Sequence, residues 1–170
     1  MSTFENQGYR WRETYFVLFD INNRPTVSQV EAALAVLNDR FELQNLQADD
    51  EGRFESVTLM SPDDFAALDI CFLQGDEVDE QVAQLNKDMR KSGEDKSQLK
   101  KLAAANARLD VLHFQDVLSG MAGGAITKDG EGDEDELDEM FDPSALLIVL
   151  DALVELTEGV AVDPQTGTLV

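Results

Sequence analysis

The sequence predicts an α+β protein in which helices pack on one face of a mixed or antiparallel sheet. Short apolar runs rich in aromatic and β-branched residues, such as Tyr15 to Phe19, are typical of strands. Segments with apolar residues at helical spacing, beginning at residues 26–39, alternate with these runs. Turn-forming residues such as Asp49 to Gly52 separate neighbouring runs. The predicted order is β-α-β-β-β-α-β-α-β-β, a variant of the ferredoxin-like pattern with an extra strand after the hairpin.

The first strand and helix are predicted from residues 15–39. Residues 15–19 are apolar on both faces, so we expect a central strand that is covered on each side. Thr26 follows Pro25 and is a candidate N-cap, because its hydroxyl can accept a hydrogen bond from the first turn. We expect the helix to end at Asp39 and Arg40. Its sheet-facing stripe comprises Val27, Val30, Ala33, Leu34 and Leu37.

Three strands are predicted next, at residues 41–46, 54–60 and 67–73. The first two form a hairpin around Asp49 to Gly52. In the third strand, alternation places Leu68, Ile70 and Phe72 on one face.

A long helical region is predicted from Asp76, a candidate cap, to about Ala105, with a kink or loop at Ser92-Gly93. Acidic residues dilute its basic ones, so we interpret it as a solvated face; docking of an acidic partner is the alternative. Six of the 13 basic residues lie there: Lys87, Arg90, Lys91, Lys96, Lys100 and Lys101.

A strand follows at residues 108–117, where alternation places His113 on the same face as Leu109 and Val111. Residues 119–140 combine glycines with dense acidic charge and predict a flexible loop. An EF-hand starting at Asp129 fails, because Glu134 and Met140 occupy the positions that need Gly and Glu. We therefore predict at most weak, non-specific binding of divalent cations by this loop.

The chain ends in a strongly apolar helix over residues 142–158, which we expect to be a core or interface helix. Gly159 ends it. A strand at residues 160–162, a turn at 163–167 and a strand at 168–170 make a closing hairpin.

Composition narrows the possible functions. A chain of 170 residues is the size of one domain, and we predict a single domain over residues 1–170. The 13 basic and 35 acidic residues give a net charge of −22, which opposes binding to nucleic acids and anionic membranes.

The single cysteine, Cys71, excludes an internal disulfide and is expected to be a core residue. The absence of a signal peptide or an apolar span predicts a cytoplasmic protein.

No catalytic motif accompanies the single histidine, so we predict no catalytic residues, metal site or cofactor. The first hypothesis is a non-enzymatic binding or regulatory module that acts through protein–protein contacts and forms a homodimer. The second is an enzyme or ligand-binding protein with a pocket between sheet and helices. Its candidate residues are Arg10, Trp11, Arg12 and His113. The third is an acidic mimic that masks a basic surface of a partner.

Overall fold

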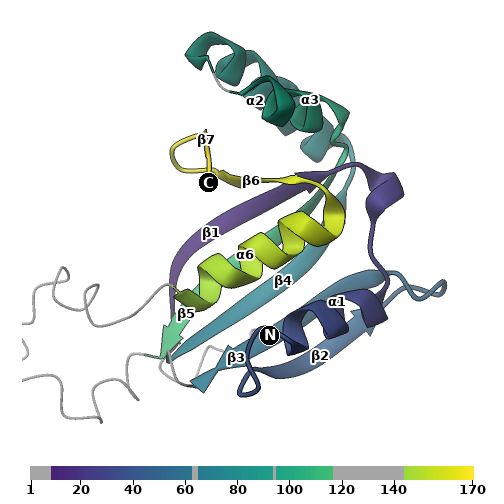
Figure 1. The fold of residues 1–170 in the computed structure, drawn as a ribbon, viewed down its shortest axis with the longest axis vertical. Helices are drawn as coiled ribbons and strands as arrows, with labels where there is room; N and C mark the ends of the chain where they lie inside the picture. The colour runs from purple at the N-terminus through teal and green to yellow at the C-terminus, as the bar shows by residue number, and fades with distance from the viewer. Residues whose placement is uncertain (1–8, 63–64, 94, 117–143) are drawn as a thin grey trace, which may run out of the picture.

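The computed structural model describes residues 9–62, 65–93, 95–116 and 144–170. It contains one seven-stranded sheet in the order β2-β3-β4-β5-β1-β6-β7, and every pair of neighbouring strands is antiparallel (Figure 1). The α+β class is thus confirmed, whereas the ferredoxin-like arrangement is not. The strands are β1 (Tyr9–Phe19), β2 (Glu42–Ala48), β3 (Phe54–Ser61), β4 (Ala66–Gln74), β5 (Ala107–Asp116), β6 (Val160–Asp163) and β7 (Thr168–Leu169).

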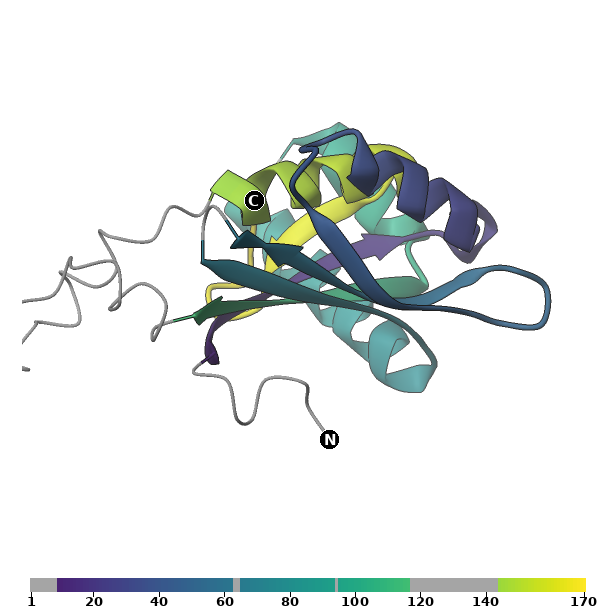
Figure 2. The same ribbon diagram turned by 90° about the horizontal axis from the view of Figure 1, so that it is seen from below.

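Within the described residues, four α-helices cover this sheet, and they lie on two faces. Val17 and Phe19 share a buried cluster with residues of the first and last helices, whereas Leu18 belongs to a second cluster with residues of the middle two. Since successive strand residues point to opposite faces, the prediction that all helices pack on one face was wrong. Figure 2 shows α1 and α6 together on one side of the sheet. The helices are α1 (Val27–Ala35), α2 (Asp76–Ser92), α3 (Lys96–Ala104) and α6 (Ser144–Thr157).

The helix boundaries follow the local sequence with small differences. Thr26 caps α1 as predicted, and Gln29 completes a capping box by accepting from the Thr26 backbone N–H. The helix ends at Ala35, before the predicted Asp39-Arg40. Gly75, not Asp76, occupies the N-cap of α2, so the predicted side-chain cap is absent and Asp76 lies in the first turn.

The predicted break at Ser92-Gly93 is confirmed, because Gly93 adopts a left-handed conformation (φ 74°) between α2 and α3. The predicted loop at 119–140, with its weak cation site, and the predicted start of the last helix at 142–143 lie outside the described residues.

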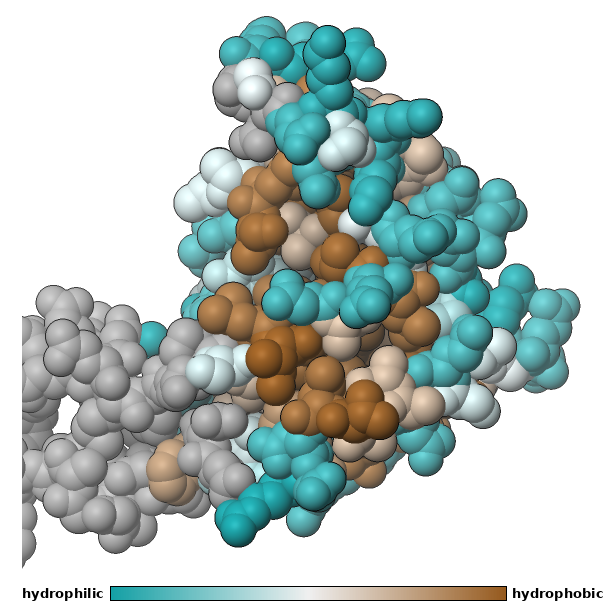
Figure 3. Space-filling model, viewed as in Figure 1, coloured by the Kyte–Doolittle hydropathy of each residue, from teal (hydrophilic) through white to brown (hydrophobic). Residues whose placement is uncertain are grey.

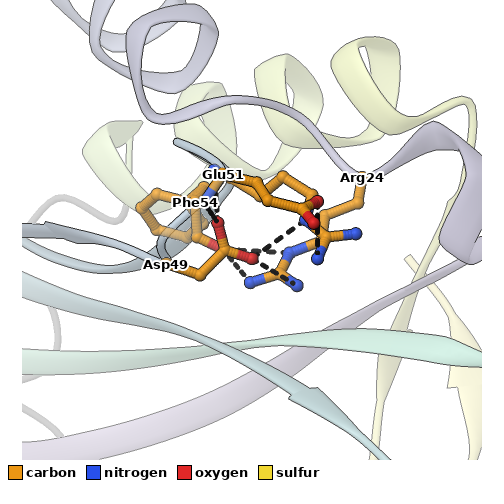
Figure 4. Close-up of polar contacts among 5 residues, drawn as sticks. Arg24, Asp49, Glu51 and Phe54 are labelled. Atoms are coloured by element: carbon orange, nitrogen blue, oxygen red, sulfur yellow. Dashed lines mark hydrogen bonds and ion pairs between the residues drawn. The ribbon is translucent and has the colours of Figure 1, made fainter.

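The β2–β3 hairpin is held to the rest of the protein by Arg24, which follows a short 3-10 helix (Ile21–Asn23). Nε and Nη2 of Arg24 donate to the Phe54 carbonyl at 3.2 and 2.9 Å, and Nη1 lies 3.5 Å from the Asp49 carboxylate (Figure 4). The Asp49 carboxylate also accepts hydrogen bonds from the backbone N–H groups of Glu51 and Arg53, which closes the turn.

Gly159 allows the chain to leave α6 and enter β6. A Cβ atom at this position would overlap the backbone oxygen of Leu18 and would lie 2.9 Å from Cβ of Phe19. Glycine therefore permits a close approach of backbone to backbone between the end of α6 and β1.

Candidate functional site

His113 lies on the α1–α6 face of β5 and is only 2% exposed. The register pairs it with Leu68 of the core, which confirms the predicted face. Among the residues that the structure describes, neither ring nitrogen has a hydrogen-bond partner, and the same holds for Oε1 of Gln115, two residues further along the strand. Buried polar atoms without partners are rare in folded proteins, so this end of β5 is a candidate ligand site.

Glu13 is the charged group opposite His113. The two residues are register partners on β1 and β5, and Oε1 of Glu13 lies 3.6 Å from Nδ1 of His113. This distance is too long for a hydrogen bond but suits an ion pair whenever the imidazole is protonated.

The other predicted site residues do not gather around His113. Arg10 is exposed and pairs with Gln115, whereas Trp11 pairs with Phe114 and so points to the opposite face. The Trp11 ring is 51% exposed, and its Nε1 donates to the Thr14 hydroxyl at 2.9 Å. A β-bulge between Trp11 and Glu13 accommodates Arg12 as an extra residue. Because of this bulge, which the sequence did not reveal, Trp11 and Glu13 lie on opposite faces, whereas Arg10 shares the face of Gln115 and His113.

The opposite face of the sheet carries the only cysteine. Burial raises the pKa of the Cys71 thiol, and the Asp69 and Asp110 carboxylates add to this effect. The thiol is therefore poorly suited to act as a nucleophile. Beside it, Arg108 bonds to Asp110 at 2.5 Å and its guanidinium lies 4.1 Å from the centre of the Phe16 ring.

Among the residues that the structure describes, no group of three or more His, Cys, Asp or Glu side chains is placed to hold a metal ion. The helices in these residues also lack the combination of length and apolar character needed to cross a bilayer. No family model, curated protein or solved structure matches the chain. The candidate sites therefore depend on the geometry of this chain alone.

A second candidate site is an apolar groove of about 260 Å³ between α6, the β6–β7 hairpin and α3, which we call the α6 groove. Figure 3 shows apolar side chains gathered over the middle of this face, where Figure 1 places α6. Leu147 is 44% exposed and Val170 is 59% exposed. The lining residues are Gln98, Leu147, Leu150, Asp151, Val154, Val160, Ala161, Leu169 and Val170.

Charged residues are exposed both on α6 and on the α2–α3 hairpin. The exposed stripe of α6 continues from Leu147 into Asp151, Glu155 and Glu158. The α2–α3 hairpin exposes all six basic residues of residues 87–101, but it also exposes acidic residues: Asp76, Glu77, Asp79, Glu80, Asp88 and Asp95. Within the described parts of the chain, none of these charged side chains forms an ion pair. The hairpin is therefore of mixed charge, and its contribution to the lining of the groove is the uncharged Gln98.

Another pocket is lined by residues of α3 and by the residue that follows α6. It has a volume of about 330 Å³ and is lined by Asp20, Asn23, Lys101, Ala104 and Glu158. Lys101 of α3 and Glu158 at the end of α6 therefore face the same space. The sequence predicted an apolar core or interface helix, but not that α3 and β6–β7 complete a groove beside it.

Proposed function

We propose that this chain is a non-enzymatic protein-binding module whose contact surface is the α6 groove. The supporting observation is the exposure of Leu147 and Val170 at the rim of an apolar groove on an otherwise strongly charged protein. Apolar patches bordered by charged residues are typical of protein interaction sites.

The chemistry of the remaining residues also favours binding over catalysis. The single histidine is buried, and the single thiol is half-buried with a raised pKa. General acid–base and nucleophilic catalysis require such groups within reach of a substrate. A cytoplasmic location is part of the proposal, and the single cysteine is compatible with it.

Binding of the neutral, environment-sensitive dye Nile red tests the surface. We expect the native protein to enhance its fluorescence and Leu147→Glu to reduce that enhancement, because the new carboxylate lies at the groove. Val36→Glu is the matched control, since Val36 is 81% exposed and is not among the residues that line the groove. Equal dye binding by the two variants would refute the groove as the accessible apolar surface.

A second candidate function is the binding of a small polar molecule beside His113. The observation in its favour is the set of unpaired atoms on His113 and Gln115. A suitable molecule would donate to Oε1 of Gln115 and bond to the imidazole. A thermal-shift screen of small amides and carboxylates, run on the wild type and on His113→Leu, tests it: a genuine ligand stabilises only the wild type.

The acidic-mimic hypothesis has weaker support. The net charge of −22 fits it, but six exposed basic residues lie within residues 87–101, so the molecule is not uniformly acidic. A mimic of this kind would bind a strongly basic protein with pronounced salt dependence.

A further inference from the structure

A further pocket, of about 320 Å³, lies at the end of the sheet where β1 and β2 begin and β3 and β5 end. Asp116, the last residue of β5, pairs with Tyr9 of β1, and its backbone N–H donates to the Phe65 carbonyl at 2.7 Å. On the other side, Glu42 of β2 pairs with Met60 of β3. The lining residues are Tyr9, Glu42, Met60, Ser61, Pro62, Phe65 and Asp116.

The lining of this pocket combines aromatic rings with carboxylates. Tyr9 and Phe65 contribute two rings, Met60 adds apolar surface, and Glu42 and Asp116 contribute two carboxylates. No basic residue is among the described residues that line the pocket. Burial raises the pKa of the Tyr9 phenol, and the Asp116 and Glu42 carboxylates add to this effect. Both carboxylates therefore act on the same ring, and the pocket favours a cation over an anion.

An organic cation suits this lining better than a metal ion. Calcium takes about six to eight oxygen ligands, and among the described residues no group of three or more acidic, His or Cys side chains is placed to hold a metal. The negative face of an aromatic ring attracts a cation, and methylated ammonium groups also pack against it. A volume of about 320 Å³ is at the lower end of the range for ligand pockets, so the ligand is small.

We propose that the pocket lined by Tyr9, Phe65, Glu42 and Asp116 binds a small organic cation of the quaternary ammonium class. The rings contact its methyl groups, and the two carboxylates offset its charge. This inference does not depend on the α6 groove, because the two sites share no lining residue.

Saturation-transfer NMR of the choline methyl signal, titrated on the full chain at constant ionic strength, tests the proposal. We expect saturable binding. The neutral carbon analogue 3,3-dimethyl-1-butanol should bind at least about tenfold more weakly, because it has the same shape without the charge. Equal affinity for the two molecules would show a pocket that is merely apolar and would overturn the proposal.

Two pairs of variants separate this pocket from the overall charge of −22. Glu42→Gln should weaken choline binding about threefold or more, whereas Glu55→Gln removes the same charge from an exposed site outside the pocket and should not. Phe65→Leu should weaken binding by about as much as Glu42→Gln. Its control is Trp11→Leu, which removes a ring that is 51% exposed and does not line the pocket. Circular dichroism shows that each variant is folded.

The same cation occurs in free choline-like molecules and in trimethylated lysine side chains, so the titration is repeated with a trimethyllysine peptide. Choline that binds as tightly as the peptide supports a free ligand, and a peptide that binds at least about tenfold tighter supports the same cation on a protein side chain. The proposal is overturned if choline shows no saturable transfer, or if Glu42→Gln and Glu55→Gln weaken its binding equally. Neither result bears on Nile red binding at the α6 groove, so failure here is distinguishable from failure of the proposed function.

Discussion

The guanidinium carbon of Arg24 lies 3.7 Å from the centre of the Phe72 ring. The side chain is only 9% exposed, and it also donates two hydrogen bonds to the Phe54 carbonyl. Arg24 thus joins the connection before α1 to both β3 and β4. A single cation in this position satisfies a carbonyl and lies close to a carboxylate (Figure 4). It also faces the Phe72 ring.

Replacement of Arg24 by Met should destabilise the protein by about 2–4 kcal/mol, because it removes charge-assisted hydrogen bonds and a cation–π contact from a mostly buried site. Urea unfolding at neutral pH measures this loss. Arg53→Met is the control, since Arg53 binds the same Asp49 carboxylate but its side chain is 44% exposed. We expect Arg53→Met to lower the free energy of unfolding by less than about 1 kcal/mol. Equal losses in the two variants would show that the buried contacts of Arg24 contribute nothing specific.

Asp49 should make stability depend on pH in the acidic range. The hydrogen bond from the Arg53 backbone N–H, with those from the Arg53 side chain and the Glu51 backbone N–H, lowers the pKa of the Asp49 carboxyl below its ordinary value of 3.8. A lowered pKa in the folded state stabilises the protein above the unfolded pKa, and that contribution is lost as pH falls through the folded pKa.

Asp49→Asn should therefore lower stability near neutral pH, and its difference from the wild type should shrink below about pH 4. Urea unfolding at a series of pH values measures the difference. Asp50→Asn serves as the control, because the neighbouring Asp50 is exposed and makes no described side-chain contact. A constant difference between Asp49→Asn and the wild type at every pH would contradict the prediction.

Gly159→Ala should destabilise the protein by about 1–3 kcal/mol, the usual cost of forcing extra atoms into a packed site. The added methyl group meets the Leu18 backbone, which is part of a central strand and cannot move aside as a flexible side chain would. Thermal unfolding of Gly93→Asn provides the comparison. Gly93 has open space around it, and Asn tolerates its left-handed conformation. A smaller loss for Gly159→Ala than for Gly93→Asn would refute this account.

The elements of the fold could be predicted because they depend on local pattern. Thr26 capped its helix, Gly93 ended α2, and the end of the apolar run, at residues 17–19, proved to be buried on both faces. Strand order and the distribution of helices could not be predicted, because β1 pairs with β5 about 90 residues away through contacts that no local pattern encodes.

In the candidate sites too, only the features that depend on local sequence pattern could be predicted. Alternation along β5 correctly placed His113 on the core face. The β-bulge between Trp11 and Glu13 changed which residues share a face, and no proline or glycine marked it in the sequence. The α6 groove could not be predicted either, since its walls come from α3, α6 and the β6–β7 hairpin, which only the tertiary fold brings together.

His113→Leu distinguishes a structural from a binding role for the buried histidine. An unpaired buried polar group costs about 1–3 kcal/mol, so an apolar side chain of similar size should leave stability unchanged or raise it. His113→Gln keeps polar atoms in the same place and should give no such gain. Chemical denaturation of the two variants and of the wild type, all purified in the same way, measures the difference.

A loss of more than about 2 kcal/mol in His113→Leu would mean that the ring nitrogens are satisfied in the native protein by a bound molecule or by ordered water. Gln115→Leu then separates these two cases. If one ligand bridges the imidazole and Oε1 of Gln115, both substitutions remove the same bound molecule, so the double variant should lose no more stability than either single variant. Additive losses would instead indicate independent water sites, and the second candidate function would lose its support.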